Sequence, residues 1–174
     1  VRTTPWMSLA AFSRLLIPEI KPDIKRAIYL DVDIIALGDI KKLWTQDLGK
    51  HIIGVSFGHD GIDFTKIKKI ESVRKNHIYF NSGMMLIDCE KWRKQGLTKK
   101  LLDVEIKTRG NRVYNDQSIL NIFFQNKYTL LPPEFNVTGH TLNHFKKSDK
   151  KTYNTLVKKS VFRHFTYERP WHNQ

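Results

Sequence analysis

Residues 27–35 read AIYLDVDII, an apolar run with strand-like composition that places two carboxylates, Asp31 and Asp33, one residue apart at its end. Unpaired carboxylates beside a buried strand are costly unless a cation or hydrogen-bond donors compensate them. The pattern therefore predicts a divalent-metal site after a buried strand. Taken alone, Asp-x-Asp is also compatible with a solvated turn.

The composition predicts one globular domain with a hydrophobic core. The chain has 174 residues, of which 40% are hydrophobic and 11% aromatic, well above what a disordered chain carries. The 30 Lys and Arg residues outnumber the 17 Asp and Glu residues, which gives a net charge of +13. An acidic partner is expected, and nucleic acid, an anionic membrane surface and a phosphorylated substrate all fit this field.

A single cysteine, Cys89, excludes an internal disulfide and a cysteine-based zinc site, which indicates a reducing compartment. No apolar stretch approaches the roughly 20 residues that a spanning helix requires, and no secretory leader is visible. A soluble or peripheral protein is expected. The first residue is Val1 rather than Met, which suggests a piece of a longer chain.

Strand-like and helix-like segments alternate, which predicts an α/β fold. Ser8 is expected to cap a helix that Pro18 ends. A second buried strand is expected at residues 52–57. Residues 77–88 read as two strand pieces broken by a turn at residues 81–83, which would expose Asn81. Helices are expected at about 90–95, 98–108 and 116–125, and the lysine-rich residues 146–159 as a solvated loop or helix face.

Five segments of the sequence indicate a specific family when they are considered together. They are residues 12–19, residues 29–44 around Asp31 and Asp33, residues 79–93, residues 115–121 and residues 164–171. In this order they resemble the family 8 glycosyltransferases, in particular the bacterial lipopolysaccharide glucosyl- and galactosyltransferases. The resemblance runs from about Trp6 to Trp171.

The resemblance implies a GT-A-type α/β fold with a central mixed sheet and makes residues 1–174 a single, partial catalytic domain. In the family, a strand–helix–strand segment precedes the helix at residues 12–19 and supplies much of the nucleotide pocket. This chain has only about ten residues there. An N-terminally incomplete sheet, with weak or absent nucleotide-sugar binding, is therefore expected of the chain alone.

The resemblance also implies a metal triad of Asp31, Asp33 and His164. Breaking a sugar–diphosphate bond puts negative charge on the leaving nucleotide, and a bound cation can hold that charge. Carboxylate oxygens suit either Mg²⁺ or Mn²⁺, and an imidazole nitrogen favours Mn²⁺. Without the family, His164 would read as a core or surface histidine.

Four further residues match family positions that line the donor sugar, namely Arg14, Asn81, Asp116 and Gln117, and the last two are the expected catalytic residues. Asp116 also reads simply as an acid that complements a helix N-terminus. Retention through a covalent intermediate would need a carboxylate, for which Asp116 is the candidate, because Gln117 is a poor nucleophile. A same-face displacement steered by the leaving phosphate is the open alternative.

Arg169 is the expected contact to the diphosphate and stands where the family usually has Lys. A guanidinium can bind a diphosphate bidentately. The surrounding segment departs from the family pattern, since Tyr167 occupies the place of a glycine and the segment is one residue short. The expectation is that this loop takes another path or that nucleotide affinity is lower.

The expected function is a metal-dependent retaining transfer of glucose or galactose from a UDP-sugar to a lipopolysaccharide core or other glycan. The expected place is the cytoplasm, with peripheral contact to the anionic inner membrane surface, and no nucleic acid is expected as partner. An inactive fragment or a non-catalytic binder of an anionic glycan or polymer is the alternative. A phosphatase of the haloacid dehalogenase type fits less well, because Ile35 stands where that pattern has Thr or Val.

Overall fold

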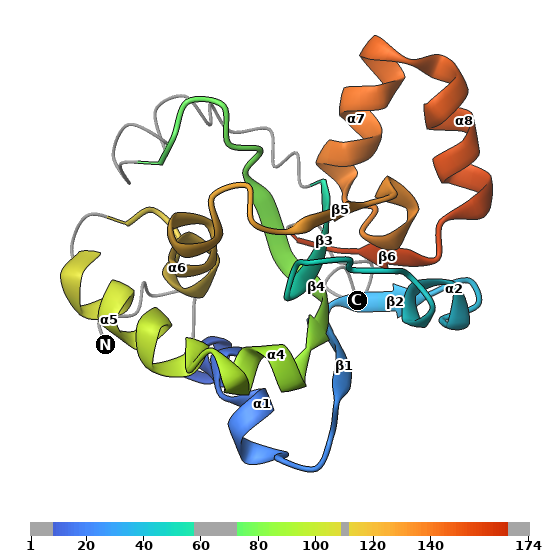
Figure 1. The fold of residues 1–174 in the computed structure, drawn as a ribbon. Helices are drawn as coiled ribbons and strands as arrows, with labels where there is room; N and C mark the ends of the chain where they lie inside the picture. The colour runs from blue at the N-terminus through green and yellow to red at the C-terminus, as the bar shows by residue number, and fades with distance from the viewer. Residues whose placement is uncertain (1–8, 58–72, 109–111, 167–174) are drawn as a thin grey trace.

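The computed structural model describes residues 9–57, 73–108 and 112–166 (Figure 1). Two 3-10 helices are labelled η. In chain order the elements are η1 (Leu9–Leu15), α1 (Ile17–Ile20), β1 (Arg26–Leu30), β2 (Ile34–Ala36), α2 (Lys41–Trp44), β3 (Ile53–Phe57), β4 (Phe80–Asp88), α4 (Cys89–Lys94), α5 (Leu97–Thr108), α6 (Asn115–Phe124), β5 (Thr129–Leu131), η2 (Pro133–Phe135), α7 (Gly139–Ser148), α8 (Lys150–Lys159) and β6 (Phe162–His164). Within the described ranges, no helix combines the length and the apolar composition needed to cross a bilayer.

The central sheet has the order β1-β4-β3-β5 and is mixed, as predicted. Strand β4 is antiparallel to both β1 and β3, whereas β3 and β5 are parallel. Helices α4, α5 and α6 lie together beside the sheet, and the α7–α8 hairpin projects at the other end (Figure 1). The expected α/β class is confirmed.

Strand β4 runs without a break through residues 81–83, so the predicted turn is wrong. All residues of β4 except the last are buried, and the exposed fraction of Asn81 is only 7%. The polar run Asn-Ser-Gly resembles a turn in sequence. Here, however, the buried Gln117 side chain of α6 accepts hydrogen bonds from the Asn81 side chain and the Ser82 N–H, so that the strand can continue.

Alternate residues of β4 serve two separate cores. Met85 and Ile87 belong to the cluster that packs against α4, α5 and α6, and Met84 and Leu86 belong to the cluster formed with α2, η2 and β6. Successive strand side chains point to opposite faces. Strand β4 is therefore covered on both faces, which accounts for its continuous burial.

The N-terminal helix differs from its prediction. Residues 9–15 form a 3-10 helix, and Pro18 lies in the first turn of α1 instead of ending a helix. Proline is tolerated in a first helical turn because the missing N–H has no partner there in any case. The expected cap, Ser8, lies outside the described residues.

A small antiparallel sheet of β2 and β6 lies beside the central sheet. Its register pairs Ile34 with His164, and the backbone N–H of Phe165 donates to the carbonyl of Asp33 at 2.9 Å. Strand β6 was not expected from the sequence. This strand brings His164 to the end of β1.

Candidate functional site

Three side chains from two distant parts of the chain meet at the end of β1. One potential ligand atom from each of Asp31, Asp33 and His164 lies within 4.8 Å of the others. The Nε2 atom of His164 is 3.1 Å from Oδ1 of Asp33 and 3.8 Å from Oδ2 of Asp31. The triad that the family resemblance implied is therefore assembled.

The chain passes from β1 to β2 through a turn that directs both carboxylates inward. The N–H of Ile34 donates to the carbonyl of Asp31 at 3.2 Å, which closes the turn. Val32, between the two acids, is fully exposed. The turn and the candidate metal site are therefore not alternatives, because the turn itself directs Asp31 and Asp33 toward His164.

The two oxygens of Asp31 have different roles. Its Oδ1 atom accepts hydrogen bonds from the Arg14 guanidinium at 2.8 Å and from the Tyr29 hydroxyl at 2.7 Å. Burial raises the pKa of Tyr29, so its hydroxyl stays protonated and donates. Protein groups therefore hold Oδ1, while Oδ2 is the oxygen that approaches His164.

Strand β4 forms the floor of this cluster at Gly83. Its carbonyl accepts the N–H of Asp31 at 2.8 Å, and a side chain at Gly83 would collide with His164 and Asp31. Glycine within a strand often marks such a close approach. The sequence predicts a turn at Gly83, whereas the structure places it in β4, where the absence of a side chain leaves room for the triad.

Arg14 links this triad to the start of α6. Its Nε atom lies 2.9 Å from Oδ2 of Asp116, and its terminal nitrogen donates to the carbonyl of Ser82 at 2.8 Å. The exposed fraction of the side chain is 7% for Arg14 and 5% for Asp116. Burial raises the pKa of Asp116, and the charge of Arg14 opposes that shift.

Gln117 and Asn81 form a buried pair beside Arg14. The Oε1 atom of Gln117 accepts from Nδ2 of Asn81 and from the backbone N–H of Ser82, both at 3.1 Å. The Oδ1 atom of Asn81 accepts from the N–H of Gly83 at 2.9 Å. Helix α6 therefore aligns its first turn with β4 through side-chain amides.

The chemistry of the donor atoms fits a divalent cation. Ligands about 2.1 Å from an octahedral ion and at right angles to each other lie roughly 3 Å apart, which matches the separation of His164 Nε2 and Asp33 Oδ1. Two carboxylates and one imidazole suit Mn²⁺ or Mg²⁺, and the nitrogen favours Mn²⁺. The three residues could therefore hold such an ion.

The structure gathers all but one of the expected site residues in one place. Arg14, Asn81, Asp116 and Gln117 are buried and adjoin the triad, whereas Arg169 lies outside the described residues. Sequence reasoning missed four contributors, namely Tyr29, Ser82, Gly83 and Asn136, whose side-chain amide lies 2.9 Å from both Asn81 Oδ1 and His164 Nδ1. Only the strand glycine carried a local signal that could have identified it.

Comparison with known proteins agrees with this geometry. The model of the family Glycosyl transferase family 8 matches residues 1–174. General stress protein A of Bacillus subtilis (strain 168) is 32% identical over 173 residues, which cover 94% of this chain and 59% of that protein. A lipopolysaccharide 1,2-glucosyltransferase of Escherichia coli is 29% identical over 150 residues, which cover 84% of this chain and 44% of that enzyme.

Solved structures show the same fold. A crystal structure of the galactosyltransferase LgtC in complex with donor and acceptor sugar analogs superimposes with a TM-score of 0.85 at 24% identity, covering all of this chain and 64% of that one. The glycosyltransferase GlyE of Streptococcus pneumoniae TIGR4 gives a TM-score of 0.69, also at 24% identity, covering 97% of this chain and 40% of that one. The fold is of the GT-A type. The match to the family model over the whole chain shows that the chain belongs to glycosyltransferase family 8.

Proposed function

We propose that residues 1–174 form part of a single catalytic domain that transfers glucose or galactose from a UDP-sugar to a lipopolysaccharide core oligosaccharide, with retention of configuration. One observation carries the proposal: the Asp31–Asp33–His164 triad is connected to the buried polar side chains of α6. Arg14 contacts both Asp31 and Asp116, and Ser82 of β4 donates to Gln117. The choice of hexose and acceptor is supported by relatives that are named lipopolysaccharide 1,2-glucosyltransferases and by the galactosyltransferase fold neighbour.

The triad would hold Mn²⁺, or Mg²⁺ as the second choice, through Asp31 Oδ2, Asp33 and His164 Nε2. When bound, such an ion neutralises the charge that develops on the leaving UDP. Arg14 and Tyr29 keep the Asp31 carboxylate in one orientation. These residues are therefore proposed to prepare the site before the nucleotide arrives.

Of the two routes to retention, the contacts favour the same-face displacement. The carboxamide oxygen of Gln117 already accepts two hydrogen bonds, which makes it a weak nucleophile. Asp116 Oδ2 is held by Arg14 and by the Ser82 hydroxyl, at 2.9 and 3.3 Å. We assign Asp116 to electrostatic stabilisation of an oxocarbenium-like sugar, and Gln117 and Asn81 to orienting its hydroxyls.

The first test is calorimetric titration of the chain with UDP, with and without Mn²⁺. UDP binding by the chain alone is expected to be weak; it should require the metal, and the double variant Asp31→Asn and Asp33→Asn should lose it. The variant Asp103→Asn removes one exposed carboxylate from α5 and serves as control. Metal-independent UDP binding, or a double variant that binds like the wild type, would refute the metal assignment.

The second test is transfer itself. UDP-glucose and UDP-galactose are supplied with a lipopolysaccharide core acceptor, and NMR of the product reads the anomeric configuration. An inverted product would exclude the retaining mechanism. UDP binding without any transfer would favour the inactive or non-catalytic alternative, for which salt should weaken binding to an anionic polymer more than chelator does. Membership of family 8 does not favour the haloacid dehalogenase alternative.

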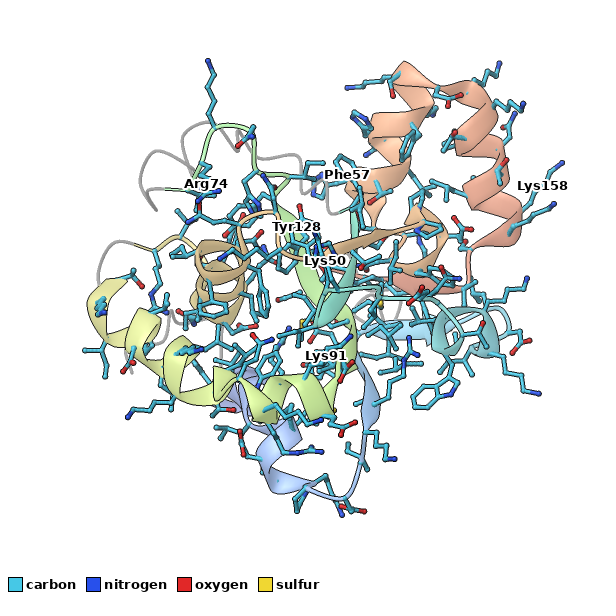
Figure 2. All side chains as sticks on the ribbon, viewed as in Figure 1. Lys50, Phe57, Arg74, Lys91, Tyr128 and Lys158 are labelled. Atoms are coloured by element: carbon cyan, nitrogen blue, oxygen red, sulfur yellow. The ribbon has the colours of Figure 1, made fainter. Side chains whose placement is uncertain are left out.

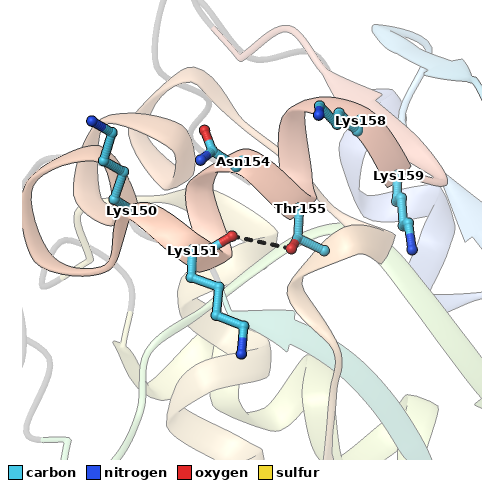
Figure 3. Close-up of a pocket in the computed structure, with 6 residues that line it drawn as sticks. All are labelled: Lys150, Lys151, Asn154, Thr155, Lys158 and Lys159. Carbon is cyan, nitrogen blue, oxygen red and sulfur yellow. Dashed lines mark hydrogen bonds between the residues drawn. The ribbon is translucent and has the colours of Figure 1, made fainter.

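Part of the excess positive charge is concentrated on α8. A shallow groove of about 470 Å³ is lined by Lys150, Lys151, Asn154, Thr155, Lys158 and Lys159 (Figure 3). These residues recur at helical spacing, so they occupy one exposed face of α8, and Lys158 points away from the body of the protein (Figure 2). We propose that this face contacts phosphate groups at the inner surface of the cytoplasmic membrane, where the acceptor would be met.

Sedimentation with vesicles tests this contact. The chain should co-sediment with vesicles that contain anionic phospholipid and remain free with zwitterionic ones, and rising salt should release it. The double variant Lys151→Glu and Lys159→Glu should lose binding. The matched variant Lys99→Glu and Lys100→Glu places the same charge change on exposed positions of α5. Equal loss in both variants would show that net charge, rather than the α8 face, is responsible.

A further inference from the structure

Asn136 lies between the metal triad and the donor-sugar residues and is completely buried. It follows η2 directly, and its backbone N–H donates to the carbonyl of Pro133 at 3.1 Å. Its Nδ2 atom donates to Oδ1 of Asn81 at 2.9 Å, and its Oδ1 atom is 2.9 Å from Nδ1 of His164. Both ends of its side-chain amide are therefore used.

The orientation of this amide follows from a backbone donor. The N–H of Gly83 donates to Asn81 Oδ1 at 2.9 Å, which fixes that atom as the oxygen. A second oxygen facing it would be repelled, so Asn136 must present its NH₂ group to Asn81. The carbonyl oxygen of Asn136 then faces His164, whose Nδ1 must carry a proton in order to donate.

The protonated Nδ1 determines what the opposite ring nitrogen offers. In the neutral imidazole, a proton on Nδ1 leaves the lone pair on Nε2. Nε2 is the atom that faces Asp33 Oδ1 at 3.1 Å and Asp31 Oδ2 at 3.8 Å. Asn136 therefore holds His164 in the form that can bind a metal ion between these groups.

The same amide also connects to the sugar-facing side. Asn81 accepts from Asn136 through Oδ1 and donates to Gln117 through Nδ2. The chain of bonds from His164 to Gln117 is buried along its whole length, with exposed fractions of 8% or less. Because buried polar networks hold one arrangement when every member is bonded, a change at Asn136 would disturb both ends.

We propose that Asn136 is a positioning residue that fixes the tautomer and orientation of His164 and couples the metal triad to Asn81 and Gln117. The inference rests on the proposed metal site. The experiments test the role of Asn136 separately from the metal site, because the tautomer of His164 can be measured without any metal.

The first experiment uses the wild-type chain. Two-dimensional ¹H–¹⁵N NMR of the histidine rings, recorded without metal at alkaline pH, should show His164 as the Nδ1–H tautomer, assigned with the variant His164→Gln. An Nε2–H tautomer would overturn the inference, whatever the metal affinity proves to be. This measurement needs no substitution at Asn136 and cannot fail through misfolding of such a variant.

The second experiment compares Mn²⁺ titrations of Asn136→Leu and Asn136→Asp. The Leu variant should weaken Mn²⁺ binding by roughly 10- to 100-fold, because His164 loses its acceptor. The Asp variant should restore only part of the affinity, since one carboxylate oxygen accepts the Nδ1 proton while the other replaces the NH₂ group that donates to Asn81 Oδ1. Near-ultraviolet circular dichroism of each variant reports whether the fold is kept.

The outcomes distinguish the two proposals. Wild-type affinity in Asn136→Leu, or equal losses in the Leu and Asp variants, would overturn the role of Asn136 and leave the metal site standing. No Mn²⁺ binding by the wild type would overturn the metal site, and the tautomer measurement would then decide on Asn136 alone.

Discussion

A Cβ atom built on Gly83 would lie 2.2 Å from Cε1 of His164. It would also lie 2.7 Å from Asp31 Oδ2 and 2.9 Å from Asn81 Oδ1. No real side chain tolerates such distances, and β4 is covered on both faces, so neither the strand nor the triad can easily retreat. The absence of a side chain at Gly83 is therefore a condition for the three ligands to meet.

The variant Gly83→Ala should bind Mn²⁺ at least about tenfold more weakly in calorimetric titration, because its methyl group displaces His164 and Asp31. The matched control is Gly139→Ala at the start of α7, where an added Cβ meets nothing within 4 Å. The control should bind Mn²⁺ like the wild type. Retained binding in Gly83→Ala would show that the ligands can rearrange around the extra carbon.

Removing Arg14 should destabilise the protein, because it leaves Asp116 buried without its cation. The variant Arg14→Met is expected to lose about 3–5 kcal/mol of unfolding free energy, the usual cost of breaking a buried ion pair on one side. Urea unfolding in the presence of chelator measures this loss. Lys94→Met, which breaks the exposed Lys94–Glu90 pair, serves as control and should change little. Equal losses of unfolding free energy in Arg14→Met and Lys94→Met would show that burial of the Arg14–Asp116 pair does not raise the cost of breaking it.

Asn121 fastens α6 to β4 and should tolerate no apolar replacement. Its amide donates to the carbonyl of Phe80 at 2.9 Å and accepts from the Phe80 N–H at 3.0 Å and from His77 Nε2 at 2.8 Å. Each buried group left without a partner costs about 1–3 kcal/mol. In urea unfolding, the loss of unfolding free energy in Asn121→Leu should therefore be several times the loss in Asn154→Leu, a variant at an exposed position of α8. Similar losses would mean that packing alone positions α6.

Ionisation of Asp116 should oppose folding. Burial raises its pKa in the folded state, so between its unfolded-state and folded-state pKa values the native protein binds more protons than the unfolded chain. Stability from this group therefore falls as the pH rises through that window. Urea unfolding of the wild type and Asp116→Asn, in chelator, should show the wild type losing stability relative to the variant from about pH 4 upward. A relative gain would mean that the Arg14 charge outweighs burial.

The features that depend on neighbours along the chain could be predicted without the structure. The apolar run and the two acids of residues 27–35 were enough to predict the strand and the paired carboxylates, but the residues of β1 are half-buried and not buried as expected. The first turn of α6 was predicted at Asp116, and the structure begins that helix at Asn115. The alternation of strand-like and helix-like segments was enough to predict the α/β class, and the GT-A type was implied by the resemblance of the ordered segments to family 8.

The features that depend on partners distant along the chain became visible in the folded protein. Asn81, Ser82 and Gly83 have the composition of a turn, but they lie in β4, where the Gln117 side chain of α6 accepts hydrogen bonds from Asn81 and Ser82. Asn136 lies in a segment with no local motif, and its importance comes from facing Asn81 and His164 at once. His164 reaches Asp33 because β6 pairs with β2. The strength of a hydrogen bond or a steric contact depends on proximity in space, which the spacing of residues along a chain does not specify.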